Sequence, residues 1–162
     1  MLNAFIDSNG VLIAYGFMES NNGDTLVEVP EDFAMTPRAA QYSNGGWSAY
    51  TAPVSPAALA AAAFDAGLMI VSTGTPALNG TYAIDQLSQM DIIAIETSLN
   101  AGKGFPGGSA SFNYADTTGA LHSFTQANFT DFAAAVRDYV YALKSVIAGA
   151  SMTLPSTTST IA

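Results

Sequence analysis

The sequence predicts an α+β protein with a small N-terminal antiparallel β domain, a connecting Ala-rich helix, and a C-terminal domain that contains a β-hairpin and two main helices. In the first fifty residues, short apolar runs alternate with Asn-Gly turns, which is typical of antiparallel hairpins. Further along, helix-capping residues precede apolar stretches of helical period. We expect a β-rich domain at 1–52, a connecting helix at 53–66, an α+β domain at 67–150 and an extended arm at 151–162.

The predicted N-terminal sheet is built from short strands. Strands at Leu2–Ile6, Val11–Gly16 and Thr25–Val29 are separated by turns at residues 8–10 and 21–24. A further hairpin pairs residues 41–42 with residues 47–50 around a Ser-Asn-Gly-Gly turn. A sheet of this size has little core of its own, so we expect it to pack against something else.

Ser55 and Pro56 predict the start of the first helix, because Ser is a good N-cap and Pro is tolerated at the first helical position. Residues 57–64 are almost all Ala and Leu, and Gly67 is suited to the end of the helix. A short Ala-rich helix lets another backbone approach closely. It could serve as a hinge or connector, or it could be an ordinary surface helix.

The C-terminal domain is predicted to continue with a strand at Leu68–Thr73, an extended segment at Thr81–Ile84 and a helix capped by Asp85. Apolar residues cover more than half of this helix, so we expect it to be largely buried; they are Leu87, Met90, Ile92, Ile93, Ala94, Ile95 and Leu99. Residues 109–114 and 120–124 then read as a hairpin around Asp-Thr-Thr-Gly.

A long helix over Gln126–Ala148, capped by Thr125 and ended by Gly149, carries the clearest periodicity. One apolar row consists of Phe129, Ala133, Val136, Val140, Leu143 and Ile147. A second row repeats every seven residues at Phe132, Tyr139 and Val146. Both rows could face the core of the domain, or the second could meet a partner subunit. In the second case, the candidate partner-interface residues are Phe132, Tyr139, Val146, Leu154 and Ile161, with the last two anchoring the C-terminal arm.

Composition limits the kinds of partner. Only 10% of residues are charged and the net charge is −9, with four cations at Arg38, Lys103, Arg137 and Lys144. Nucleic acid requires clustered Lys and Arg, so we expect no nucleic-acid binding and no binding to anionic membranes. No apolar window reaches the roughly 20 residues of a membrane helix. A surface so poor in charge suggests either contact with other chains, as a homo- or hetero-oligomer, or a monomer coated in Gly, Ser and Thr.

No motif in the chain indicates catalysis, a cofactor or a metal. His122 is the single histidine; its neighbour Ser123 points to the opposite face of the strand, which is wrong for a relay with Asp116. Gly102–Gly108 follows a helix and lacks the order of a phosphate-binding loop. Asp7–Gly10 has only a fragment of a calcium-loop pattern, and the chain has no cysteine. We therefore expect a protein that is not an enzyme.

The C-terminal three-fifths, Gly67 to Ala162, resembles a bacteriophage family of unknown molecular function whose members are encoded among tail and tail-fibre genes. The matching pieces occur in order: Gly67–Thr73, Pro76–Asp85, Phe105–Gly108, Asp116–Phe124 with His122, Phe129–Leu143 and Leu154–Pro155. More loosely, the first half resembles the β-rich starts of small phage tail proteins at Val29–Phe33, Gln41–Tyr42 and Gly46–Trp47.

This resemblance implies a role in the phage tail region. The protein would be made in the host bacterial cytoplasm and reside in the virion tail, where it joins or decorates the fibre, baseplate or tail tip. An alternative is a tail-fibre assembly chaperone that binds fibre protein and is absent from the mature particle. In both cases its partners are other phage tail or fibre proteins. The family has no established catalytic residues, so none are transferred to this chain.

Overall fold

The computed structural model describes residues 1–162, which form two compact units, Met1–Pro53 and Val54–Ala162. The N-terminal unit contains only strands, and the C-terminal unit contains all three α-helices together with five strands. The predicted α+β class is therefore confirmed. The exposed stretch at residues 51–55, which has no helix or strand, connects the two units.

The N-terminal unit is a three-stranded antiparallel sheet with an added hairpin. Its strands are β1 (Leu2–Ile6), β2 (Leu12–Gly16) and β3 (Thr25–Val29), in the order β2-β1-β3, followed by the hairpin of β4 (Ala40–Ser43) and β5 (Gly46–Ala49). The backbone N–H of Tyr42 donates to the carbonyl of Gly10 at 2.8 Å, which ties the hairpin to the turn before β2. The small core contains Leu2, Ala4, Leu12, Val29 and Ala40.

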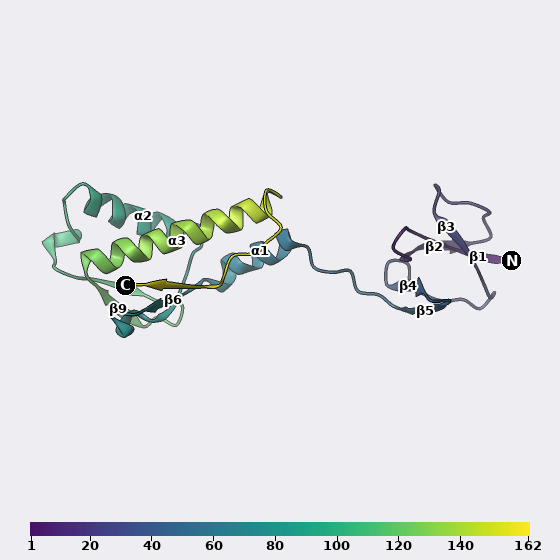
Figure 1. Ribbon diagram of the computed structural model, residues 1–162, viewed down its shortest axis with the longest axis horizontal. Coiled ribbons are helices and arrows are strands. Elements are labelled where there is room, and N and C mark those ends of the chain that lie inside the picture. Colours follow the sequence, from purple (N-terminus) through teal and green to yellow (C-terminus); the bar gives the residue numbers. More distant parts are fainter. The chain divides into compact units, whose positions relative to one another are not determined.

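The C-terminal unit places helices around a small mixed sheet (Figure 1). Its helices are α1 (Pro56–Ala66), α2 (Gln86–Asn100) and α3 (Gln126–Ile147). Its strands are β6 (Leu68–Ser72), β7 (Gly80–Tyr82), β8 (Phe112–Ala115), β9 (Leu121–Phe124) and β10 (Thr158–Ile161). The sheet order is β10-β6-β7, in which β6 pairs parallel with β10 and antiparallel with β7, while β8 and β9 form a separate hairpin.

Side-chain caps begin all three helices where the sequence predicts them. The hydroxyl of Ser55 accepts from the N–H of residue 58, and that of Thr125 accepts from the N–H of residue 128, each at 3.2 Å. The carboxylate of Asp85 accepts from the N–H groups of residues 87 and 88. These bonds satisfy N–H groups that otherwise lack partners at the start of a helix. Gly67 ends α1 with a φ of 81°, and a Cβ there would lie 2.6 Å from the carbonyl oxygen of Tyr82.

An aromatic cluster at the N-terminal half of α3 forms the centre of the C-terminal core. Phe132 lies 4.8 Å from Tyr82 and 5.1 Å from Phe124 between ring centroids, and Phe129 lies 5.6 Å from Phe132. Rings from three other segments surround this pair: Phe105, Phe112 and Tyr114. Most of these contacts are tilted or edge-to-face, the arrangements that aromatic rings prefer. The cluster joins α3 to the β8–β9 hairpin and to β7.

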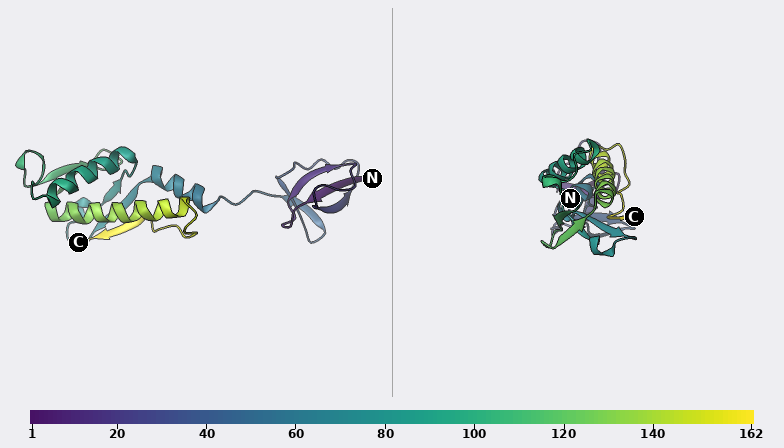
Figure 2. Two further views of the ribbon diagram at one scale, coloured as in Figure 1. Left: turned by 90° about the horizontal axis from the view of Figure 1, so that it is seen from above. Right: turned by 90° about the vertical axis from the view of Figure 1, so that its left-hand side faces the viewer.

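The predicted domain boundaries need correction. Helix α1 is not a connector between the domains, because it packs on α3 and its Ala60 is fully buried in the same core. The second unit therefore begins at Val54 and not at residue 67. The segment predicted as a free arm at 151–162 also belongs to this unit, since its last residues form β10 against β6. Figures 1 and 2 show α2 on one side of α3 and β10 along the other.

Two buried tyrosines of the C-terminal core differ in one respect that can be measured. The hydroxyl of Tyr82 donates to the carbonyl of Leu78 at 2.7 Å, whereas the buried hydroxyl of Tyr139 has no hydrogen-bond partner. Tyr82→Phe should lower the free energy of unfolding by about 1 kcal/mol, because it removes a made hydrogen bond. Tyr139→Phe should leave it unchanged or raise it, because it removes only an unpaired polar group.

Denaturant unfolding followed by far-ultraviolet circular dichroism isolates this unit, because all three helices lie in it. A loss of stability in Tyr139→Phe as large as that in Tyr82→Phe would contradict the assignment.

Candidate functional site

Helix α2 exposes large apolar side chains along one side. The exposed fractions of Leu87, Met90 and Ile93 are 68%, 60% and 59%, and only Ile92 of this helix is fully buried. The prediction that α2 is largely buried is therefore wrong. The reason is that α2 packs on α3 along a single side, where Ile92, Ile95 and Leu99 point, and no other part of the unit covers its remaining face.

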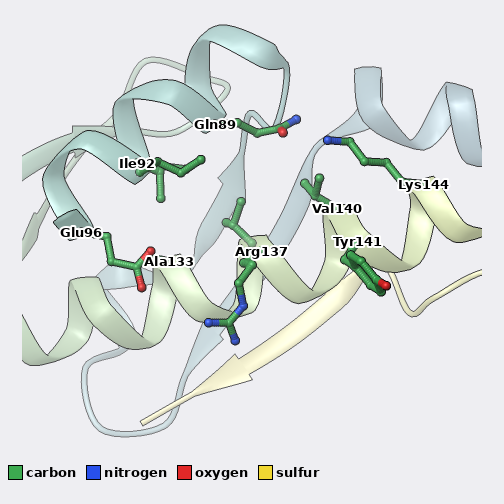
Figure 3. Close-up of a pocket in the computed structure, with 10 residues that line it drawn as sticks. Gln89, Ile92, Glu96, Ala133, Arg137, Val140, Tyr141 and Lys144 are labelled. Atoms are coloured by element: carbon green, nitrogen blue, oxygen red, sulfur yellow. The ribbon is translucent and has the colours of Figure 1, made fainter. Parts of the chain in front are cut away.

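A groove of about 310 Å³ lies between α2 and α3. Its floor consists of the buried residues Ile92, Ala133, Val136 and Val140. Its rim carries Gln89, Ile93 and Glu96 from α2 and Arg137, Tyr141 and Lys144 from α3 (Figure 3). We call this surface the α2–α3 groove. Tyr141 on the rim is 74% exposed, so the apolar face of α2 continues across the groove to an exposed aromatic ring.

The rim of the groove holds two of the four cations of the chain, Arg137 and Lys144. Arg137 forms an ion pair with its neighbour Asp138 at 2.9 Å, but both side chains are well exposed, so solvent weakens this pair. Lys144 has no ion-pair partner within the chain. In a protein of net charge −9, this places a basic strip on the α3 side of an apolar groove.

The residues predicted from sequence as a partner interface lie elsewhere. Phe132, Tyr139 and Val146 are buried in the unit's own core, so this row of α3 is not available to a partner. Ile161 is buried in the same core, because β10 pairs with β6 instead of docking on another chain. Of the five, Leu154 alone remains partly exposed, on the connection between α3 and β10.

Sequence analysis missed the exposed face of α2, although its spacing offered a clue. Ile92, Ile95 and Leu99 are separated by three and four residues and form one row, which the structure places toward the core. Leu87, Met90 and Ala94 have the same spacing and form a second row on the exposed side. Two apolar rows on one short helix are compatible with burial on both sides, or with one side in the core and one left for another molecule.

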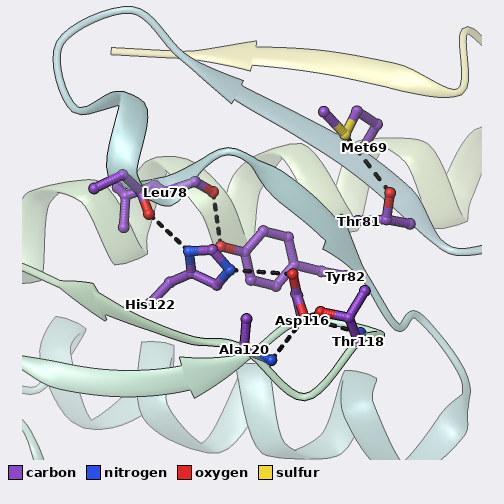
Figure 4. A network of polar contacts seen from close by, with 9 residues as sticks. Met69, Leu78, Thr81, Tyr82, Asp116, Thr118, Ala120 and His122 are labelled. Carbon is purple, nitrogen blue, oxygen red and sulfur yellow. Dashed lines mark hydrogen bonds and ion pairs between the residues drawn. The ribbon is translucent and has the colours of Figure 1, made fainter.

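A second cluster of polar groups surrounds His122 (Figure 4). One ring nitrogen, Nδ1, lies 2.7 Å from the carbonyl oxygen of Ala77, and the other, Nε2, lies 3.2 Å from a carboxylate oxygen of Asp116. Gly80 packs directly against the pair; a Cβ at Gly80 would lie 3.1 Å from that carboxylate. The cluster thereby links the β8–β9 hairpin to the segment that contains β7. With both ring nitrogens facing oxygen atoms within the chain, neither is free to activate the hydroxyl of Ser123.

Asp116 is the best-satisfied carboxylate of this cluster. Its second oxygen accepts from the hydroxyl of Thr118 at 2.7 Å and from the N–H groups of Thr118 and Ala120 at 2.8 and 3.0 Å. The hydrogen bond from the Thr118 hydroxyl, together with those from His122 and the two backbone groups, lowers the pKa of Asp116 to about 2. Burial, aided by the charge of Asp116, raises the pKa of Tyr82 beyond its ordinary value.

No group of three or more His, Cys, Asp or Glu side chains in the structure is arranged to hold a metal ion. None of the helices combines the length and the apolar content that crossing a membrane requires. Comparisons with protein-family models, curated proteins and solved structures find no match to this chain. The groove and the His122 cluster therefore have to be interpreted from their own chemistry.

The lowered pKa of Asp116 has a measurable consequence for acid stability. Because the folded pKa, about 2, lies below the ordinary value of 3.8, ionised Asp116 stabilises the fold above the ordinary pKa. This contribution is lost as the pH falls from that value toward about 2. Asp116→Asn should therefore reduce stability near neutral pH, and its difference from the original chain should shrink as the pH falls through this window.

Acid titrations of unfolding, again followed through the helices, check the prediction. Asp131→Asn is the matched control, since Asp131 is exposed on α3 and is named in no hydrogen bond or ion pair. The interpretation fails if Asp116→Asn and Asp131→Asn show the same dependence of stability on pH.

Proposed function

We propose that this chain is a non-enzymatic structural and interaction protein of the bacteriophage tail region, which joins or decorates the fibre, baseplate or tail tip. The observation that carries the interaction role is the α2–α3 groove with the exposed side chains of Leu87, Met90 and Ile93 beside it. Contiguous apolar surface bordered by polar groups is typical of protein–protein contacts. The phage assignment itself is based on the resemblance of residues 67–162 to the tail-associated family.

The two-unit organisation favours a joining role. Each unit has a separate apolar core, and the connection at residues 51–55 is exposed and contains Pro53. A protein with two folded units can hold two different neighbours at once, and a short connection keeps the two binding events coupled. The N-terminal unit also exposes apolar side chains, Phe17 and Met18 among them, which suits a second contact.

The second candidate, a tail-fibre assembly chaperone, is favoured by one feature of the groove. A furrow between two helices with an apolar floor is the shape that receives an amphipathic helix of another protein. A chaperone would bind such a segment of the fibre protein during assembly and then leave. The two candidates differ in whether the chain stays in the finished particle.

Quantitative mass spectrometry of purified particles distinguishes these candidates. A structural component should be present in a fixed number of copies per particle after high-salt washing, because protein–protein contacts hold it there. A chaperone should be absent from the particles but should copurify with fibre protein from infected cells. Deleting the gene should cause loss of fibres or tail-tip structures in both cases.

A matched pair of variants links this test to the groove. Leu87 and Leu121 have the same exposed fraction, 68%, but only Leu87 lies on α2, while Leu121 lies on β9. Leu87→Glu should reproduce the deletion defect in part and Leu121→Glu should not. Normal, infectious particles in the absence of the gene, together with no affinity for any tail protein, would refute both candidates.

A further inference from the structure

The α2–α3 groove is chemically complementary to a second copy of itself. Helix α2 carries the acidic residues Asp91 and Glu96 and has no Lys or Arg. The α3 side of the groove carries the basic residues Arg137 and Lys144. Between these charges lie the exposed apolar residues Leu87, Met90, Ile93 and Tyr141. One surface of the chain thus contains an apolar centre with an acidic helix on one side and a basic helix edge on the other.

We propose that two copies of this chain associate through their α2–α3 grooves as a two-fold symmetric dimer, in which α2 of each copy lies against the α3 rim of the other. The inference rests on the part of the proposed function that makes the groove an interaction surface, and it names the occupant as a second copy. It does not depend on the phage assignment.

Two-fold symmetry makes the charge pattern meaningful. In an isologous contact, the same patch meets itself, so each feature on one copy must find its complement elsewhere in the same patch. Rotation by a half turn brings the acidic α2 opposite the basic rim of α3 twice over. The patch would instead repel itself if both helices carried the same sign of charge.

The residues around Arg137 support this orientation. Asp138 is paired with Arg137, but it lines a different hollow that also contains Pro155, Ser156 and Thr158. Its carboxylate therefore belongs to the opposite side of α3 from the groove. Lys144, which has no ion-pair partner within the chain, is the cation that gains most from a carboxylate of the second copy.

Tyr141 would provide the aromatic anchor of this contact. Its ring is 74% exposed on the rim, next to the apolar floor of the groove. Large aromatic side chains at the centre of an interface often contribute most of the binding energy. The packing of α2 and α3 from both copies would form a four-helix arrangement that covers Leu87, Met90 and Ile93.

The overall charge of the chain opposes this association. Each copy carries a net charge of −9, so two copies repel at long range, most strongly at low ionic strength. The local complementarity acts at short range, within the groove. Dimers should therefore form more readily at moderate salt concentration than at very low salt concentration.

Sedimentation velocity of the full chain over a range of concentrations tests the proposal. The original chain should reach a mass of twice 16.7 kDa. Leu87→Glu should weaken self-association by about tenfold or more, because it buries a charge at the centre of the contact. Leu121→Glu should have no effect, although Leu121 is equally exposed. Circular dichroism verifies that both variants keep their helices.

A charge-segregation experiment tests the choice of a second copy as the occupant. One variant carries Asp91→Lys and Glu96→Lys, which makes its groove entirely basic; the other carries Arg137→Glu and Lys144→Glu, which makes its groove entirely acidic. Each variant alone should remain monomeric, and an equimolar mixture should form heterodimers.

The possible outcomes separate cleanly. Self-association that responds to Leu87→Glu, combined with heterodimers from the charge-segregated pair, supports the proposal. An original chain that stays monomeric at all concentrations overturns it, even where the groove captures a helix from another protein. Dimers that survive Leu87→Glu, or that persist in both charge variants alone, also overturn it. None of these results depends on the composition of phage particles, which tests the proposed function separately.

Discussion

The burial of α3 is the constraint on which the C-terminal unit depends. This helix carries eight buried residues over Gln126–Ile147, more than any other element, and it contacts α1, α2, β6, β9 and β10. The rings of Phe129 and Phe132 anchor one end to the β8–β9 hairpin, while Leu143 and Val146 belong to the same core further along. Because the surrounding elements are small, they cover α3 incompletely on the side toward α2, and the groove is the result.

The apolar surface beside the groove follows from a mismatch between helix size and available cover. Helix α2 has apolar residues on two sides, but the unit has only one long helix to pack against. Its inward row meets α3, and its outward row remains in solvent. The exposure of three large side chains on one helix is unfavourable in an isolated chain, since each retains apolar area that burial would remove from water.

Local chemistry made much of the fold predictable from sequence. Ser55, Asp85 and Thr125 cap the three helices through hydrogen bonds that involve only the next few residues. The Asn-Gly turns likewise determine the hairpins of the N-terminal unit, whose strands β1 and β3 have the predicted bounds. The pairing of β10 could not be predicted in this way. Its sequence, Thr-Ser-Thr-Ile, has one large apolar residue, and its partner β6 lies far away along the chain.

The candidate site was less predictable because it depends on which faces find neighbours. The seven-residue repeat of Phe132, Tyr139 and Val146 is the same whether it faces a core or a partner, and only the packed structure shows that it is buried. In the opposite sense, Leu87, Met90 and Ile93 look like core residues in sequence and are exposed. The contact of His122 with Ala77 spans 45 residues, so no local pattern announces it.

The parallel pairing of β6 with β10 has a consequence for synthesis. Strand β6 lies at the centre of its sheet, yet Ser72 and the carbonyl group of Ala162 that it binds are 90 residues apart. A ribosome delivers β7 soon after β6, but it releases residues 158–161 only after the hairpin and α3 have emerged. During that interval, one edge of β6 lacks its partner and can accept a strand from another nascent chain. Polysomes that produce many copies close together would favour such exchange, so the rate of translation would influence whether this strand closes its own sheet or that of a neighbour.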